Sequence, residues 1–241
     1  MPPRAAISNG IITVVILFFM LLLGMLLKAR YRLHSDSASS AVPVAAVPKA
    51  IPVAIPVQSQ EPVHEARAYK VGDWWVLPNP ELVPSRANEA DTLRIKSGAK
   101  EDVFVLYFVD AAEISASRPK RLREQAEFFQ KAPQNVVLAT GEQAMAFVGK
   151  QLSTHKFKVY TKWGRVPESE RYYAFITVEL EKNKHYDLGE LLVRKGFAAP
   201  LGQQTGSLPP QLPASDQYVQ QLGRALAMAR TEQAGAWVKS E

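Results

Sequence analysis

The sequence contains no cysteine, which excludes disulfide bonds, thiolate-bound zinc or iron–sulfur sites and a cysteine nucleophile. Its four histidines are scattered without metal-ligand spacing, which argues against a histidine zinc site. Outside the N-terminus, basic residues exceed acidic ones only slightly. The formal net charge is +6, but four of the 29 basic residues lie in 1–32, which leaves 25 against 23 acidic ones. A net charge of +2 does not indicate a nucleic-acid surface.

Residues 11–27 form a long apolar run, IITVVILFFMLLLGMLL. As a helix this run would be about 26 Å long at about 1.5 Å per residue, close to the span that a bilayer requires. It is longer than the apolar part of a signal peptide, and Lys28, Arg30 and Arg32 follow at once. The sequence therefore predicts a single-pass membrane anchor over 11–32 after a short flank, 1–10, with a cleaved signal peptide as the alternative.

The basic residues around this run leave the side of the membrane open. Arg4 and the α-amino group flank one end, and three basic residues flank the other. The positive-inside rule thus favours a cytoplasmic C-terminal domain by a single charge.

Residues 33–68 form a linker rich in alanine, proline and valine. Pro43, Pro48, Pro52 and Pro56 recur every four or five residues, and proline removes amide donors and restricts φ. This composition predicts an extended polyproline II segment, which over 37–60 would reach roughly 75 Å at about 3.1 Å per residue. We interpret it as a spacer that holds a domain away from the bilayer; a ligand for a partner protein is the alternative.

The remaining residues, 69–241, show mixed α+β patterning. Strands are expected where Val, Ile, Phe, Tyr and Leu gather, at 73–77, 92–96, 103–109, 157–161 and 172–179, with a hairpin turn at 97–100. Helices are expected at 120–131 and 215–232 from apolar residues at helical spacing. Thr140 with Gln143, and Asp187 with Glu190, have the spacing of capping boxes that begin two more helices. The order of strands and helices favours an α+β fold.

Five motifs in this region resemble the staphylococcal nuclease-like (thermonuclease-like) family. They are EADTL at 89–93, FVLYFVDAAE at 104–113, GEQAMAF at 141–147, LVRKGFA at 192–198 and GAW at 235–237. The resemblance covers about 70–241. It implies a five-stranded OB-fold barrel with three or more helices, and a calcium-dependent phosphodiesterase that hydrolyses DNA or RNA.

Carried over by position, the resemblance also implies a set of site residues. Asp91 and Asp110 would be the carboxylate ligands of a Ca²⁺ ion, with the carbonyl of Ala111 as a third ligand. Such a hard cation prefers oxygen donors. Glu113 would be the general base, and Glu89 would replace an aspartate near the ion, with a longer side chain that could still bind ion-coordinating water.

The family's two phosphate-binding arginines are only partly matched. Val105 stands at the position of the first, and an aliphatic side chain cannot replace a bidentate guanidinium. Losing one such donor typically costs on the order of 10²–10³ in rate. The second corresponds to Arg171, with Arg165 as the alternative. An inserted segment, 114–138, adds a basic helix with Arg118, Lys120, Arg121 and Arg123, which we interpret as a solvated face.

Three functions remain open from the sequence. The first is a membrane-anchored, calcium-dependent nuclease in which another residue replaces the missing arginine, for example from the inserted helix. The second is a catalytically degenerate module that keeps the barrel and binds nucleic acid or protein, because fold does not establish function. The third is a structural module without a nucleic-acid role. The soluble domain is expected to be a monomer, and no protein partner is indicated.

Overall fold

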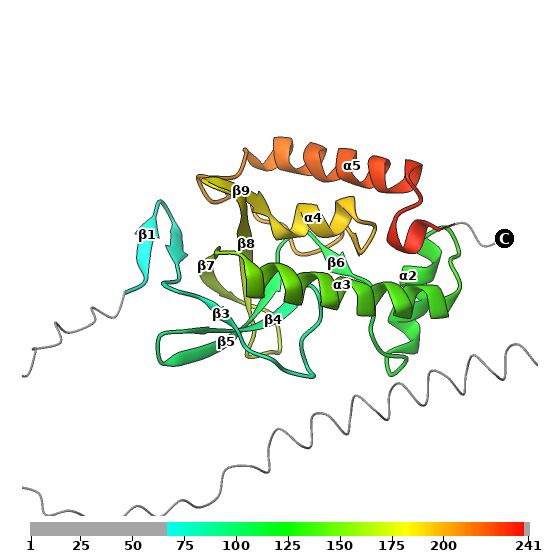
Figure 1. Cartoon of the computed structure of the whole chain (residues 1–241), viewed down its shortest axis with the longest axis horizontal. Coiled ribbons are helices and arrows are strands. Elements are labelled where there is room, and N and C mark those ends of the chain that lie inside the picture. Colours follow the sequence, from blue (N-terminus) through cyan, green and yellow to red (C-terminus); the bar gives the residue numbers. More distant parts are fainter. Residues whose placement is uncertain (1–66, 239–241) are drawn as a thin grey trace, which may run out of the picture. The chain divides into compact units, whose positions relative to one another are not determined.

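The computed structural model describes residues 67–238 (Figure 1). The expected anchor at 11–32 and nearly all of the linker at 33–68 lie outside these residues. Among the helices of 67–238, none combines the length and the apolar character that crossing a membrane requires. The described residues form an α+β fold with a mixed sheet and helices packed against it.

The main sheet has eight strands, in the order β1-β2-β7-β8-β5-β4-β3, with β9 paired to β8. Neighbours run antiparallel except β5 and β8, which are parallel. The strands are β1 (Tyr69–Val71), β2 (Trp74–Val76), β3 (Glu81–Leu82), β4 (Thr92–Ser97), β5 (Lys100–Leu106), β7 (Phe157–Arg165), β8 (Tyr172–Glu181) and β9 (Lys184–Asp187). A small second sheet pairs β6 (Asp110–Ala111) with β10 (Ala198–Ala199).

The five expected strands are present, and β4 shows why. Its Leu93 and Ile95 are buried while Lys96 is exposed, as period-two alternation predicts. The expected turn is confirmed, since Ser97 pairs with Lys100 around Gly98, whose φ is +61°. The strand expected at 103–109 lies instead at Lys100–Leu106. It ends there because Phe108 adopts a φ of +64°, and its N–H donates to the carbonyl of Gln203 rather than to a strand.

Within 67–238, four α-helices and one 3₁₀ turn accompany the sheets. They are α2 (Pro119–Phe128), α3 (Gln134–Thr154), α4 (Leu188–Arg194), α5 (Ser215–Thr231) and the turn η1 (Gly235–Trp237). The helices expected at 120–131 and 215–232 correspond to α2 and α5. On α2, Leu122 and Ala126 are buried as predicted, and Phe129 just beyond the helix packs edge-on against Trp237 with ring centroids 5.0 Å apart. In Figure 1, α5 lies beside α4, and the chain end at η1 returns to α2.

Only one of the two predicted capping boxes marks a helix start. Asp187 caps α4, because its Oδ1 accepts the N–H of Glu190 at 2.9 Å. The prediction at Thr140 is wrong: α3 begins at Gln134, and Thr140 lies buried inside it. Helix α3 thus extends about one and a half turns before Thr140, and its buried residues begin at Val137.

Helix α3 contacts the chain closely at Gly141. A Cβ atom there would lie 2.3 Å from the carbonyl oxygen of Glu113 and 2.6 Å from that of Ala112. Only glycine therefore allows α3 to pack directly on the backbone of this segment. Gly149, on the same helix, has no atom within 4 Å of the corresponding point.

We predict opposite effects for alanine at these two glycines. Gly141→Ala should lower the free energy of unfolding by about 2 kcal/mol or more, because a backbone carbonyl cannot yield cheaply. Gly149→Ala should raise it by up to about 1 kcal/mol, because alanine favours the helical state. Urea unfolding followed by tryptophan fluorescence measures both, since all four tryptophans lie within 67–238. Equal effects of the two changes would contradict the packing described for α3.

Asp187 is a buried carboxyl between α4 and α5. The hydroxyl of Tyr218 donates to its Oδ1 at 2.6 Å. Burial raises the pKa of Asp187 from 3.8 to about 6, although the Tyr218 hydroxyl and the Glu190 N–H act in the opposite direction. The folded chain therefore holds this proton more tightly than the unfolded chain does.

This difference predicts that the contribution of Asp187 to the free energy of unfolding falls as pH rises. Between about pH 4 and 6 the unfolded chain loses the Asp187 proton first, so ionisation of this group costs the folded state up to about 3 kcal/mol by pH 7. Asp187→Asn keeps an oxygen acceptor and removes the titration. Its unfolding free energy should vary less over this pH range than that of the wild type or of Asp216→Asn, an exposed control at the start of α5. Indistinguishable pH profiles for all three chains would contradict the assignment.

Candidate functional site

A cavity of about 350 Å³ is lined by several of the residues that the sequence singled out, whereas Ala111 and Glu113 do not line it. It opens between the start of β4, the end of β5, the β6 segment, the start of α2 and the loop at 201–203. Its lining contains charged, apolar and polar residues: Glu89, Asp91, Thr92, Val105, Leu106, Val109, Asp110, Arg118, Arg121, Val166, Arg171, Tyr173, Leu201, Gly202 and Gln203.

Asp91 lies just before β4 and is 4% exposed. Its Oδ2 accepts the backbone N–H of Ala111 at 2.7 Å, and its Oδ1 accepts the hydroxyl of Thr92 at 3.0 Å. Burial raises the pKa of Asp91 to about 6, and the Ala111 N–H partly offsets this effect. Both carboxylate oxygens of this candidate ligand are therefore engaged by donors of the chain itself.

Asp110 and Ala111 form β6, and pairing with β10 fixes their backbone. The side chain of Gln125, from α2, donates from Nε2 to the Ala111 carbonyl at 2.7 Å and to Oδ2 of Asp110 at 3.3 Å. Oδ1 of Asp110 accepts from Nη2 of Arg121. The other two candidate ligands thus also have donors in place, both from the inserted helix.

Glu113, the expected general base, has a side chain with 0% exposure. Nη2 of Arg118 lies 2.8 Å from its Oε2, and Nε of Arg121 contacts its Oε1. Its backbone N–H donates to Oε1 of Gln125 at 2.8 Å. Burial raises the pKa of Glu113, and the two arginines act in the opposite direction. In this arrangement the Glu113 carboxylate is not exposed to solvent.

Arg118, the N-cap residue of α2, and Arg121 within it contact three of the four acids. Arg118 also pairs with Glu89, and Arg121 joins Asp110 to Glu113. Burial alone would lower the pKa of Arg121, but Asp110, Asp91 and Glu113 together raise it. The interpretation of the basic helix as a solvated face is thus wrong for Arg118 and Arg121, whereas Lys120 and Arg123 are exposed as expected.

The three positions considered for the phosphate-binding arginines differ in whether they line the cavity. Val105 lies on β5 between Thr92 of β4 and Tyr173 of β8, and it lines the cavity with an aliphatic side chain. Arg171 also lines the cavity, and Oγ of Ser169 accepts from its backbone N–H and from its Nε. Arg165 does not line the cavity; it pairs with Glu170 at 3.0 Å.

The ligand atoms that the resemblance implies for calcium do not fit an ion in this arrangement. Asp91, Asp110 and the Ala111 carbonyl each accept hydrogen bonds from the protein. Within the described part of the chain, no three His, Asp or Glu side chains are grouped so that they would hold a metal ion. A guanidinium occupies the space between Asp110 and Glu113.

Sequence reasoning named Arg118 and Arg121 but interpreted them as a solvated face, and it missed Gln125 as a site residue. A signal was present, because positions 118, 121 and 125 follow the three- and four-residue spacing of one helix face. The sequence does not show that this face of α2 packs onto the residues after β6.

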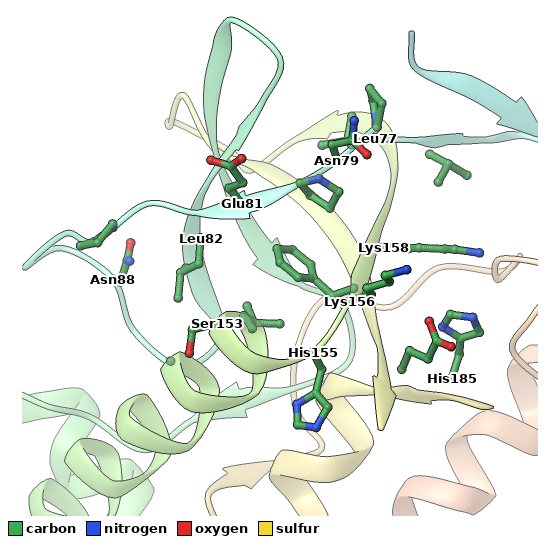
Figure 2. Close-up of a pocket in the computed structure, with 18 of the residues that line it drawn as sticks. Leu77, Asn79, Glu81, Leu82, Asn88, Ser153, His155, Lys156, Lys158 and His185 are labelled. Carbon is green, nitrogen blue, oxygen red and sulfur yellow. The ribbon is translucent and has the colours of Figure 1, made fainter. Parts of the chain in front are cut away.

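A larger cavity, of about 1030 Å³, lies elsewhere in the domain (Figure 2). Leu82, Leu152 and Phe157 contribute apolar surface, and Lys156 and Lys158 contribute positive charge. His155 and His185 also line it. None of the residues predicted for the site lines this cavity, and it shows no pairing of acids and arginines like that around Glu113.

Comparison of the sequence with family models and with characterised proteins gave no significant match. The resemblance to thermonuclease-like domains therefore depends on the motifs given above.

Gln125 offers a test of the site's construction. Gln125→Leu should lower the free energy of unfolding by about 2–4 kcal/mol, because it removes the donor to the Ala111 carbonyl and the acceptor of the Glu113 N–H, both buried. Glu124→Leu, at the exposed neighbouring position, should change it by less than about 0.5 kcal/mol. Urea denaturation of both variants provides the measurement. A similar, small loss in each would show that Gln125 does not hold the site together.

Proposed function

We propose that residues 69–241 are a thermonuclease-like domain on an OB-type barrel, in which the former active site binds a phosphodiester strand without metal-dependent hydrolysis. The sheet order supports the barrel. β2 and β3 lie near opposite ends of the strand order, yet only residues 77–80 separate them along the chain. A sheet whose two ends belong to one short segment must curl back on itself.

The observation that carries the proposal is the double ion pair of Glu113. A general base must reach the proton that it removes, directly or through one water. Here the carboxylate of Glu113 is fully buried and contacts Arg118 and Arg121. The candidate calcium ligands are engaged in the same network. Hydrolysis would require this network to open, whereas binding of a phosphate at the rim would not.

Arg171 is the cation that this arrangement leaves for a ligand. Among the residues that the structure describes, it forms no ion pair with a carboxylate, and Ser169 holds its guanidinium beside the cavity. Tyr173 lines the same cavity and adds an aromatic surface. Arginine binds phosphate in a bidentate manner, and aromatic rings stack on unpaired bases. We therefore propose single-stranded DNA or RNA as the ligand.

We further propose that the apolar segment 11–32 anchors this domain to a membrane and that 33–68 acts as its spacer. The supporting observations are the length of the apolar run and the regularly placed prolines in the sequence. The proposal covers a single-pass protein and leaves both orientations open.

Binding to labelled oligonucleotides tests the proposed function. The full chain, purified in detergent, is titrated against fluorescent single-stranded DNA and RNA and followed by anisotropy. Arg171→Gln should weaken binding about tenfold, the size of one charge-assisted phosphate contact, and lower the slope of log K against log salt by about 0.7. Arg165→Gln is the matched control and should have little effect. An equal loss in both variants, or no measurable binding by the wild type, would refute the proposal.

A second candidate is a calcium-dependent phosphodiesterase. The observation in its favour is that Arg118 and Arg121 bring guanidinium groups to Asp110 and Glu113, where Val105 leaves the expected arginine missing. The same oligonucleotides, incubated with calcium or with a chelator, separate the two candidates. Calcium-dependent cleavage that Asp110→Ala abolishes would establish the enzyme, and intact oligonucleotides under both conditions support the binding module.

A further inference from the structure

The strand pairing of the main sheet opens beside the larger cavity. The last bond between the β2 segment and β7 runs from the N–H of Leu77 to the carbonyl of Val159, at 3.1 Å. The chain then turns away from β7, because Pro78 and Pro80 have no N–H to donate and Asn79 between them adopts a φ of +40°. All three of these residues line the cavity of about 1030 Å³.

The start of β7 is therefore left with one unpaired edge. The carbonyl of Lys156 accepts the N–H of Glu179 at 2.8 Å, which directs the backbone of Lys156 toward β8. Hydrogen-bonding directions alternate along an antiparallel strand, so the N–H and C=O of Phe157 point away from β8 and toward the opening. In the described part of the chain no strand pairs with Phe157 on that side. Such an edge can accept an added strand.

The two faces of this edge differ in chemistry. Phe157 is buried, and it lines the cavity together with Leu82 of β3 and Leu152 of α3. Lys156 and Lys158 alternate with Phe157 along the strand and therefore lie on its opposite face. Figure 2 shows Leu82 on one side of the cavity and the two lysines on the other. A strand added here would meet apolar side chains on one face and ammonium groups on the other.

The charges that line the cavity leave a positive excess. Three cations and two carboxylates line it: Arg67, Lys156, Lys158, Glu81 and Glu179. The carboxylate of Glu179 already accepts the N–H of Asn183 at 2.8 Å, and Glu81 lies directly across from Lys96 in the β3–β4 pairing. Within 67–238 neither Lys156 nor Lys158 forms an ion pair with a carboxylate. The cavity thus favours a ligand with negative charge.

Lysines at an open strand edge oppose pairing with most other strands. Acidic residues at the facing positions reverse this effect, because opposite charges across a strand pair attract. We propose that the cavity is a docking site for an extended segment of a partner protein in which acidic and apolar residues alternate, and which pairs with residues 156–158 of β7. Directly opposed residues share a face of the sheet, so an apolar residue lies opposite Phe157 and acidic ones lie opposite the lysines. This docking site is separate from the Arg171 cavity and does not depend on nucleic-acid binding.

A labelled peptide tests the proposal. The full chain in detergent is titrated against a fluorescein-labelled heptapeptide of alternating glutamate and valine, EVEVEVE, and followed by anisotropy. We expect a Kd on the order of 10⁻⁴ M, in the range of a small, transient contact. The double variant Lys156→Gln with Lys158→Gln should weaken binding about fivefold, the size of two exposed ion pairs. Lys120→Gln with Lys182→Gln changes the charge equally at two exposed lysines outside the cavity and should have little effect.

Methylated peptides test the strand pairing itself. In the proposed register the valine opposite Phe157 directs its N–H toward β7, whereas the glutamate N–H groups point to the other edge of the peptide. N-methylation of the valines should therefore abolish binding, and N-methylation of the glutamates should leave most of it. An equal loss with both peptides would overturn the proposed pairing.

The remaining outcomes also decide the proposal. No anisotropy change up to about 1 mM peptide overturns it, and so does an equal loss in the two double lysine variants. If the variant at Lys156 and Lys158 weakens oligonucleotide binding and leaves peptide binding unchanged, the cavity belongs to a nucleic-acid surface and the proposal is overturned. Arg171→Gln should not affect the peptide, so failure of the proposed function and failure of this docking site are distinguishable.

Discussion

The buried carboxylate of Glu113 depends on the guanidinium groups of Arg118 and Arg121. A carboxylate with no solvent exposure and no partner would cost several kcal/mol or would lose its charge. Arg118 is the N-cap residue of α2 and Arg121 lies within it, so this ion pairing ties that helix to the segment that follows β6. On the other side, Gly141 brings α3 against the carbonyl of Glu113 itself. Two helices therefore converge on a single residue, one through charge and one through close backbone contact.

In this network, arginines of the chain itself neutralise most of the carboxylates of the site. Glu89, Asp110 and Glu113 are each in contact with an arginine of α2, and Asp91 is hydrogen-bonded to the backbone and to Thr92. Such a site needs no external cation to be stable. It also leaves little freedom for the movements that water activation requires, since the base and the ligands already have partners. Binding at the rim through Arg171, which we propose as the function, would leave this network intact.

Much of the secondary structure could be predicted from local patterns. Alternation along β4, the Asp187 cap of α4 and the apolar face of α2 each depend on residues close together in the chain, and the structure confirms them. The errors have physical reasons of the same local kind. Thr140 has the spacing of a cap but lies within a helix that starts at Gln134, and Phe108 ends a strand through its backbone conformation despite a favourable side chain.

The sequence by itself determined the residue types of the site and their order: four acids, with Val105 between them in the chain, and a basic segment after them. It also indicated the longer strands and the helices α2 and α5, since periodicity is a local property. Only the tertiary structure decided that Arg118, Arg121 and Gln125 of α2 face those acids, because the packing of one helix against a distant segment depends on contacts that no short stretch encodes. The same packing decided that Arg171 rather than Arg165 lines the cavity. The charges were present in the chain, and the fold paired them.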